Sequence, residues 1–230
     1  MDLMTVLNFA NISYKSDIKV GAFLRIKGID EYLDNDLGEY RYIYFIKENT
    51  LYISIRGSYE LENWVQDVLT TSIGEGFVKI LHHLINQSVL EDANVNKIVI
   101  TGHSLGGSIA INLGNHIKDI YKNITVDVVA FSPMKPYKNK YKNKANVYYF
   151  TVEGDIAPLY PFGWYISGKE IFFNKKGKIS KFNKLTKILG VFRGIFNKGY
   201  GVIESHKIEI LQKNISNNKK KLEVFGLWIW

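Results

Sequence analysis

The sequence predicts an α/β fold, with a mostly parallel sheet covered by helices on both faces and preceded by an antiparallel hairpin. Two observations predict it. Runs of β-branched residues alternate with apolar helical stripes between residues 40 and 152, a pattern typical of strand and helix repeats. The chain has 230 residues, 46% of them hydrophobic, which is enough for one full core. We therefore expect a single domain over residues 1–230.

The hairpin comes first along the chain. Residues 40–47 and 51–56 are two β-rich runs separated by three residues, a spacing that predicts an antiparallel pair. An apolar helical stripe follows over residues 77–89, and then a strand at 98–100, a helix carrying Ile109, Leu113, Ile117 and Ile120, and strands at 124–131 and 147–152. The Lys-, Asn- and Tyr-rich residues 137–144 are expected to form a solvated loop.

Composition narrows the class of protein. The chain has no cysteine, which excludes disulfides, thiolate catalysis and cysteine zinc sites. The first 17 residues carry Asp2 and only a short apolar patch, and no apolar run approaches the roughly 18 residues of a membrane span. We therefore expect a cytoplasmic protein without a signal peptide or transmembrane segment. The net charge of +8 comes without a nucleic-acid-binding motif, so no nucleic-acid partner is expected.

A nucleophile motif stands between the predicted strand at 98–100 and the helix that follows. Residues 102–106 read Gly-His-Ser-Leu-Gly, the Gly-x-Ser-x-Gly pattern of the nucleophile elbow of α/β hydrolases. Gly102 and Gly106 are required because a Cβ atom at either position would collide with the neighbouring backbone. The strand, turn and helix around it predict that Ser104 is held at the end of the sheet as a nucleophile.

A serine nucleophile requires a base and an acid that orients the base. His206 is the only histidine far enough after Ser104 to leave room for an acid in the order Ser, acid, His. We expect Asp155 to be the acid because it directly follows a strand and precedes two prolines. The alternatives between Ser104 and His206 include Asp119, Asp127, Glu153, Glu170 and Glu204.

The other histidines are not expected to take part in the chemistry. The ring of His103 belongs to the elbow and should project away from the reacting face, where we assign it a supporting role. His82 and His83 are adjacent on a predicted helix and cannot both face one metal ion. His116 stands beside the apolar stripe of the helix after the elbow and is expected to pack there. No metal site and no cofactor are predicted.

Two backbone N–H groups are needed where negative charge develops on the substrate oxygen. One comes from Leu105, directly after the nucleophile. The second must come from a loop after an earlier strand, and Gly57 and Ser58, at the end of the run 51–56, meet that need. We therefore predict that Ser58 and Leu105 form an oxyanion hole, with Gly57 allowing close approach.

These motifs together resemble the class-three (fungal-type) lipases over roughly residues 40 to 210. The resemblance rests on Arg56-Gly57-Ser58 followed by Trp64 and Asp67, on Gly76-Phe77, on the elbow at residues 101–107, on Asp155 with Pro158 and on Ser205-His206. It implies an α/β-hydrolase fold with Ser104, Asp155 and His206 as the triad and Asp67 as an acceptor for the Ser58 hydroxyl. Gly74 and residues 131–134 depart from the family pattern, which leaves the acyl-group preference open.

The resemblance implies a serine hydrolase that cleaves carboxylic esters of lipids through an acyl-enzyme, as a triacylglycerol lipase or a phospholipase A. Residues 59–71 would cover the site as a lid or pack as an ordinary helix. A soluble small-ester esterase is one alternative. A catalytically idle, membrane-binding module with a hydrolase-like fold is the other, but the retention of all three triad residues and both oxyanion positions argues against it. Oligomeric state, acyl position, chain length and head group stay open.

A basic segment follows the acid. Residues 169–198 hold nine Lys and Arg side chains and one acid, so their charge of +8 equals that of the whole chain. Within the segment, apolar residues from Ile179 onward recur at helical spacing. We expect the residues from Ile179 onward to form a basic amphipathic helix, through which this insertion contacts an anionic membrane surface. The alternative is a helix whose apolar face packs on the core.

Overall fold

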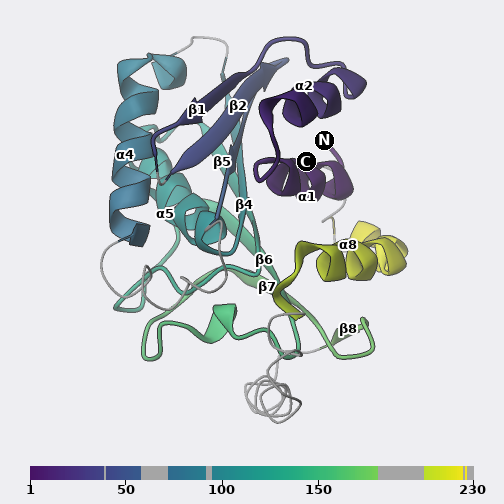
Figure 1. Ribbon diagram of the computed structural model, residues 1–230. Helices are drawn as coiled ribbons and strands as arrows, with labels where there is room; N and C mark the ends of the chain where they lie inside the picture. Colours follow the sequence, from purple (N-terminus) through teal and green to yellow (C-terminus); the bar gives the residue numbers. More distant parts are fainter. Residues whose placement is uncertain (39, 58–71, 92–94, 181–204, 225, 227–230) are drawn as a thin grey trace.

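The computed structural model describes residues 1–38, 40–57, 72–91, 95–180, 205–224 and 226, except for the side chains of residues 72 and 73. Within these residues one eight-stranded sheet forms the centre, and its strands lie side by side in sequence order (Figure 1). The strands are β1 (Leu33–Asp36), β2 (Arg41–Lys47), β3 (Thr50–Ile55), β4 (Lys97–His103), β5 (Thr125–Phe131), β6 (Asn146–Val152), β7 (Lys169–Phe173) and β8 (Ile179–Ser180).

The sheet is antiparallel at its two edges and parallel in its centre. β1 pairs with β2, and β2 with β3, in antiparallel register, whereas β3 to β7 all run parallel. β8 returns antiparallel to β7. The predicted hairpin and parallel sheet are therefore confirmed. Because the central strands run parallel, their carboxyl ends meet at one edge, where ligands bind in open α/β sheets.

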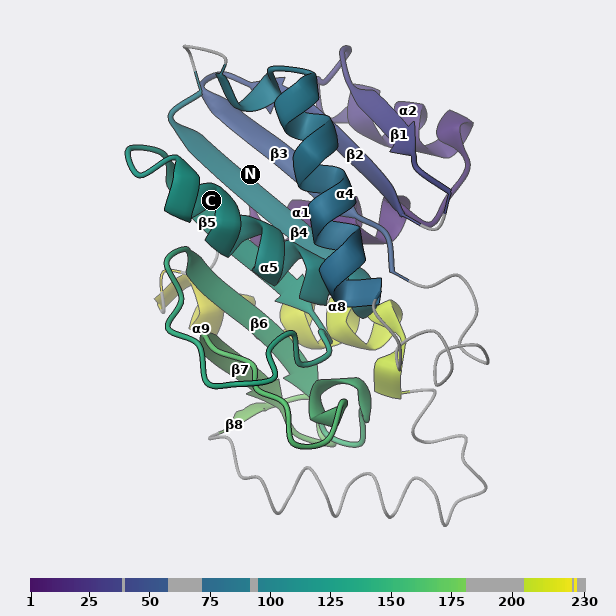
Figure 2. The same cartoon turned by 90° about the vertical axis from the view of Figure 1, so that its left-hand side faces the viewer.

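Helices cover both faces of the sheet, as the sequence predicted. α4 (Ser72–Asn86) and α5 (Leu105–Ile120) lie on one face and contact each other (Figure 2). α1 (Leu3–Ile12), α2 (Asp17–Ile26), α8 (Ile208–Asn217) and α9 (Lys219–Val224) lie on the other. Short 3₁₀ turns occupy Val89–Glu91 and Ala157–Leu159. None of the helices in the described ranges combines the length and hydropathy that a bilayer span requires.

The two amino-terminal helices were not predicted. α1 begins after Asp2, whose Oδ1 accepts a hydrogen bond of 2.8 Å from the Thr5 N–H and so caps the helix. Its apolar side chains Leu3, Val6, Leu7 and Ala10 are buried in a cluster with Phe131 and Phe150 of the sheet. The short apolar patch near the start of the chain is therefore a core helix. Each such side chain contributes roughly 1.5–3 kcal/mol when fully buried.

The predicted helical stripe is wrong at its first residue, Ile179, and the described part of the basic segment forms two strands. Residues 169–173 form β7, which pairs with β6 and buries Ile171, Phe172 and Phe173. Ile179, which we assigned to the helical stripe, pairs with Phe173 in β8. β7 was not predicted, because the period of a short, continuous apolar run does not separate a buried strand from a helix. Residues 181–198, with the rest of the predicted helix, lie outside the described residues.

The turn from β4 into α5 brings three stretches of backbone into contact. A Cβ atom built on Gly106 would lie 2.2 Å from the carbonyl oxygen of Ile55 in β3. A Cβ atom on Gly102 would lie 2.5 Å from the backbone of Gly106. Backbone atoms cannot move aside as a flexible side chain can, so glycine is required at both positions. The first turn of α5 thus packs directly on the end of β3.

We expect Gly106→Ala to destabilise the fold by more than the roughly 1–3 kcal/mol of an ordinary overpacked site, because backbone rather than side chain must shift. The matched control is Gly74→Ala in α4, where a new Cβ meets nothing within 4 Å. That change should stabilise the protein by about 1 kcal/mol, the helix preference of alanine over glycine. Urea unfolding of both variants measures the difference, and equal stabilities would contradict the assigned backbone contact.

Candidate functional site

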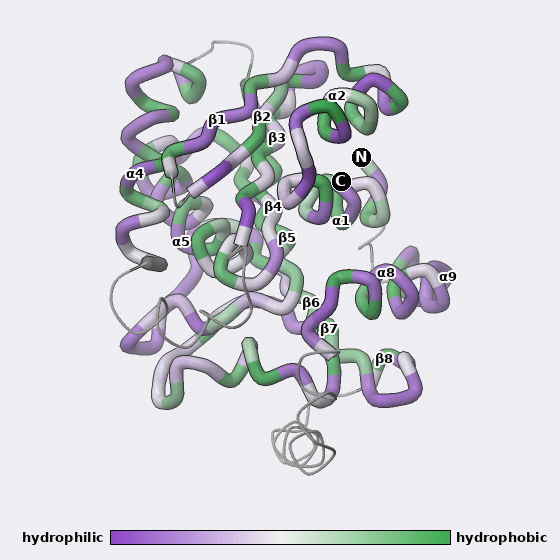
Figure 3. The backbone as a smooth tube through the Cα atoms, viewed as in Figure 1, coloured by the Kyte–Doolittle hydropathy of each residue, from purple (hydrophilic) through white to green (hydrophobic). Residues whose placement is uncertain are grey.

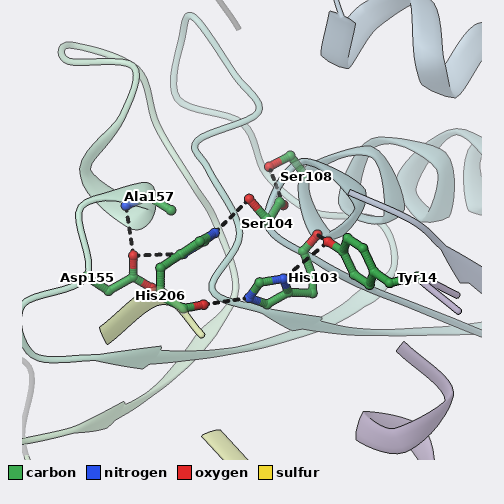
Figure 4. Close-up of polar contacts among 7 residues, drawn as sticks. All are labelled: Tyr14, His103, Ser104, Ser108, Asp155, Ala157 and His206. Atoms are coloured by element: carbon green, nitrogen blue, oxygen red, sulfur yellow. Dashed lines mark hydrogen bonds and ion pairs between the residues drawn. The ribbon is translucent and has the colours of Figure 1, made fainter. Parts of the chain in front are cut away.

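Ser104 lies between the end of β4 and the start of α5. Its backbone has φ 58° and ψ −126°, a conformation that a residue with a side chain adopts at a cost of roughly 1–3 kcal/mol. The Ser104 N–H donates a hydrogen bond of 2.9 Å to the Phe131 carbonyl of β5, which holds the strained turn. The predicted elbow is therefore present, and it directs the Ser104 hydroxyl away from the strand, toward His206 (Figure 4).

Ser104, His206 and Asp155 contact one another in a chain (Figure 4). The Oγ atom of Ser104 lies 2.9 Å from Nε2 of His206, and Nδ1 of His206 lies 3.0 Å from Oδ1 of Asp155. All three are buried, with exposed fractions of 4%, 4% and 0%. An imidazole whose Nδ1–H donates to a carboxylate has a free lone pair on Nε2. Nε2 can therefore accept the Ser104 hydroxyl proton.

The loop after β6 holds Asp155 in place. Gly154 has φ 92°, which turns the chain sharply after Glu153, and the Asp155 N–H donates to the Val152 carbonyl. The Ala157 N–H donates a hydrogen bond of 2.9 Å to Oδ1 of Asp155. The other oxygen, Oδ2, is buried and has no hydrogen-bond partner among the described residues. One oxygen is thus shared between a backbone amide and the imidazole.

The other acids between Ser104 and His206 are engaged elsewhere. Asp127 is paired with Lys97 near the amino ends of β4 and β5, 3.0 Å between Oδ2 and Nζ. Asp119 pairs with Lys144. Glu153 and Glu170 have different partners again: Oε2 of Glu153 accepts from the Lys175 N–H, and Oε1 of Glu170 accepts from the Thr151 hydroxyl. Glu204 lies outside the described residues. Among the described acids between Ser104 and His206, Asp155 is the one whose carboxylate lies within hydrogen-bond distance of Nδ1 of His206.

The oxyanion side of the site is described in part. Leu105 is the first residue of α5, so its N–H has no acceptor within the helix. Gly57 packs against the elbow, because a Cβ atom on it would lie 2.6 Å from the His103 carbonyl oxygen and 3.3 Å from Cβ of Ser104. Ser58 and Asp67 lie outside the described residues, as does the predicted lid at 59–71. The end of β3 that leads to Ser58 therefore adjoins Ser104.

The remaining histidines pack or face solvent. His82 is exposed, and the half-buried His83 bonds to the Tyr42 hydroxyl. His116 is exposed and stacks on Phe77, with ring centroids 4.3 Å apart. Within the described ranges, no group of three or more His, Asp and Glu side chains is arranged to hold a metal ion.

Sequence reasoning missed Tyr14, which lies between α1 and α2. Its hydroxyl accepts a hydrogen bond of 3.1 Å from the Gly57 N–H and lies 3.2 Å from Nδ1 of His103. Nε2 of His103 lies 2.9 Å from the His206 carbonyl oxygen. Burial, and then the neighbouring His206, lower the pKa of the His103 imidazole to about 3. Nothing in the sequence near Tyr14 signals this contact, because 89 residues separate Tyr14 from His103.

Comparisons with known proteins give a family match for the central part of the chain. The sequence model of the family described as Lipase (class 3) matches residues 52–164, a stretch that contains Ser104 and Asp155. No curated protein sequence matches the chain.

Solved structures of lipases share the fold. A lipase from Rhizopus microsporus var. chinensis matches with a TM-score of 0.57 at 18% identity, over 74% of this chain and 72% of the other. A lipase from Yarrowia lipolytica matches with a TM-score of 0.59 at 19% identity, over 88% and 90%. A triacylglycerol lipase described as having a serine protease triad at its catalytic centre matches with a TM-score of 0.56 at 20% identity, over 74% and 77%.

The family match and the fold both relate this chain to lipases. The matched region holds the strand, the elbow and the loop that carries Asp155, and the eight-stranded sheet agrees with that of the lipase structures. The family comprises lipases, which are carboxylic ester hydrolases acting on lipids. Residues 52–164 of this chain match the class 3 lipase family, and the architecture of the chain is the α/β-hydrolase fold.

Proposed function

We propose that this protein hydrolyses carboxylic esters of lipids by acyl transfer through Ser104. The observation that carries the proposal is the buried chain from Ser104 through His206 to Asp155, with contacts of 2.9 and 3.0 Å. Its nucleophile end lies on a strained turn that directs the hydroxyl toward the base. A serine protease triad is described for the catalytic centre of one triacylglycerol lipase with this fold, which supports the same roles here.

In the first half of the reaction, Ser104 attacks the ester carbonyl. His206 Nε2 takes the hydroxyl proton as the Oγ–C bond forms, and the charge on the imidazolium is stabilised by the Asp155 carboxylate. The carbonyl oxygen becomes an oxyanion. The N–H of Leu105 and the N–H of Ser58 are the donors that we assign to it, and Asp67 is the acceptor that we assign to the Ser58 hydroxyl.

In the second half, the acyl group is released. His206 gives its proton to the leaving alcohol as the ester bond breaks, which leaves an acyl-Ser104 ester. Water then attacks that ester, His206 takes a proton from the water, and the carboxylic acid leaves as Ser104 recovers its proton. The residues named here account for every proton transfer in this cycle.

Lipid esters are the substrate class that we favour, either a triacylglycerol or a phospholipid cleaved in the phospholipase A manner. Support comes from the family, whose members are lipases. A small-ester esterase would use the same triad with a different pocket, so the two candidates differ in their response to acyl length and to an interface.

The second part of the proposal is a contact with anionic lipid. We assign this contact to the turn between β7 and β8. Lys175, Lys176 and Lys178 are exposed there, and the turn is hydrophilic (Figure 3). Lys175 and Lys176 line a shallow cavity together with Lys213 of α8 and Ser205, the residue before His206. The basic turn therefore lies beside the segment that carries the base, where an anionic surface would bring lipid to the site.

We expect Ser104→Ala to abolish labelling by a fluorophosphonate and to lower ester turnover by a factor on the order of 10⁶, as in related triads. The substrates are esters of increasing acyl length, assayed with and without a lipid interface. Ser54→Ala is the matched control, because Ser54 is a buried serine of β3 whose Oγ donates a hydrogen bond to the Phe9 carbonyl and not to the triad. Undiminished hydrolysis by Ser104→Ala would overturn the proposal. A hydrolysis rate that falls as the acyl chain lengthens and does not rise at a lipid interface would favour the small-ester esterase.

For the acid, Asp155→Asn should preserve the fold and lower kcat by roughly 10⁴, because the base loses the carboxylate that sets its tautomer. Asp127→Asn removes an equally buried carboxylate that pairs with Lys97, and Glu153→Gln alters a turn contact. Both should keep nearly full activity. If either control loses activity while Asp155→Asn retains it, a different acid serves His206.

Replacing Lys175, Lys176 and Lys178 by Gln should weaken binding to anionic vesicles by about 100-fold, since each Lys near such a surface contributes about 1 kcal/mol. Hydrolysis of a soluble short-chain ester should be unchanged. The matched control removes Lys15, Lys19 and Lys27, which are equally exposed and lie in or beside α2, at the other end of the molecule from β8 (Figure 1). Equal loss of binding in both triple variants would mean that net charge alone, and not this turn, attracts the surface.

A further inference from the structure

Tyr14 connects the amino-terminal helices to the candidate site. It follows α1, and its ring lies edge-on to the His103 ring, with centroids 6.0 Å apart and an interplanar angle of 68°. The hydroxyl accepts from the Gly57 N–H at 3.1 Å. Its proton has two acceptors, Nδ1 of His103 at 3.2 Å and the His103 carbonyl at 3.3 Å, so the hydroxyl binds His103 in either case (Figure 4).

The other ring nitrogen of His103 determines the direction of these hydrogen bonds. Nε2 lies 2.9 Å from the His206 carbonyl oxygen, and a carbonyl only accepts, so Nε2 carries the proton. Because burial lowers the pKa of His103, the ring is neutral near pH 7 and Nδ1 keeps a lone pair. Burial also raises the pKa of the Tyr14 hydroxyl, so that group remains a donor.

The result is a chain of hydrogen bonds with one polarity. It runs from the Gly57 N–H to the Tyr14 hydroxyl, from that hydroxyl to His103, and from Nε2–H of His103 to the backbone of His206. His103 and His206 also pack ring against ring, with centroids 4.7 Å apart.

Each member of the chain adjoins a reacting group of the proposed function. Gly57 directly precedes Ser58, the assigned oxyanion donor, and His103 directly precedes the nucleophile Ser104. His206 is the base itself. The three segments come from the end of β3, the end of β4 and the approach to α8, which are not covalently close, so hydrogen bonds across them fix their relative positions.

We propose that Tyr14 and His103 are positioning residues that hold the oxyanion turn, the nucleophile and the base in register for ester hydrolysis. The inference rests on the proposed function. Tyr14 touches none of the reacting atoms that we assign, so it acts through Gly57, His103 and His206. A displacement of about 1 Å among reacting groups lowers the rate by roughly 100-fold, and the loss of the Tyr14 hydroxyl leaves two polar groups free to shift.

The first experiment is Tyr14→Phe, which keeps the ring and removes only the hydroxyl. With a soluble short-chain ester we expect kcat to fall by about 10- to 100-fold and KM to change by less than about 3-fold, since alignment rather than binding is lost. The rate of fluorophosphonate labelling at Ser104 should fall by the same factor as kcat. Tyr137→Phe is the matched control, because it removes a hydroxyl that accepts a hydrogen bond of 2.9 Å from Asn115, outside the site. It should keep the wild-type rate.

A spectroscopic measurement tests the hydrogen bond itself. Nitrogen-15 NMR of the imidazoles, with His103 assigned by its absence in His103→Asn, should show a neutral ring protonated at Nε2. In Tyr14→Phe the Nδ1 signal should shift, as an acceptor does when it loses its donor. If Tyr14→Phe does not fold, 3-fluorotyrosine incorporated at position 14 changes the acidity of the hydroxyl while preserving its shape, and both kcat and the Nδ1 signal should change.

The outcomes separate this inference from the proposed function. A wild-type protein that hydrolyses esters and labels at Ser104, with Tyr14→Phe equal to it in kcat and in Nδ1 signal, would overturn the positioning role and leave the hydrolase intact. A wild-type protein that neither labels nor hydrolyses any ester would overturn both. A stability loss without a change in kcat would make Tyr14 a packing residue and would also overturn the inference.

Discussion

The close approach of backbone at the elbow is the constraint on which the rest of the structure depends. The first turn of α5 lies so near the end of β3 that no Cβ atom fits on Gly106. This contact sets the position of α5 on the sheet, and it forces Ser104 into its strained conformation. The strain persists because β5 accepts the Ser104 N–H through Phe131 and because buried apolar side chains hold α5 from both sides.

Helices from the two ends of the chain together cover the second face of the sheet. α1 and α8 pack against each other, and the Gln212 side chain donates a hydrogen bond of 2.8 Å to Asn8. His206 stands just before α8, so its position relative to Ser104 depends on helices at both termini. α1 packs on apolar residues of β5 and β6 together with α8, and Tyr14, which follows α1, reaches the elbow from there.

Much of the fold was predictable, because residues near in sequence carry it. The hairpin, the elbow strand, α5 and strands β5 and β6 follow from local periodicity and turn residues. The contact of Asp155 with His206 also agrees with the prediction, since a residue after a parallel strand stands at the same edge as the elbow. β7 was not predicted, and α1 was interpreted only as an apolar patch. Short buried segments lack a distinctive period, so only their partners in the sheet or core identify them.

By itself the sequence determined the elbow and the chemistry of its residue types, because the Gly-x-Ser-x-Gly pattern and the strand and helix periods beside it are contiguous in the chain. It also limited the base to one histidine through chain order. The tertiary structure decided which acid meets that base, because six carboxylates stand between Ser104 and His206 and burial with a partner is a long-range property. It alone brought Tyr14 to His103 across 89 residues. The Tyr14 hydroxyl reaches His103 because whole helices pack on the sheet. No short sequence motif encodes that packing.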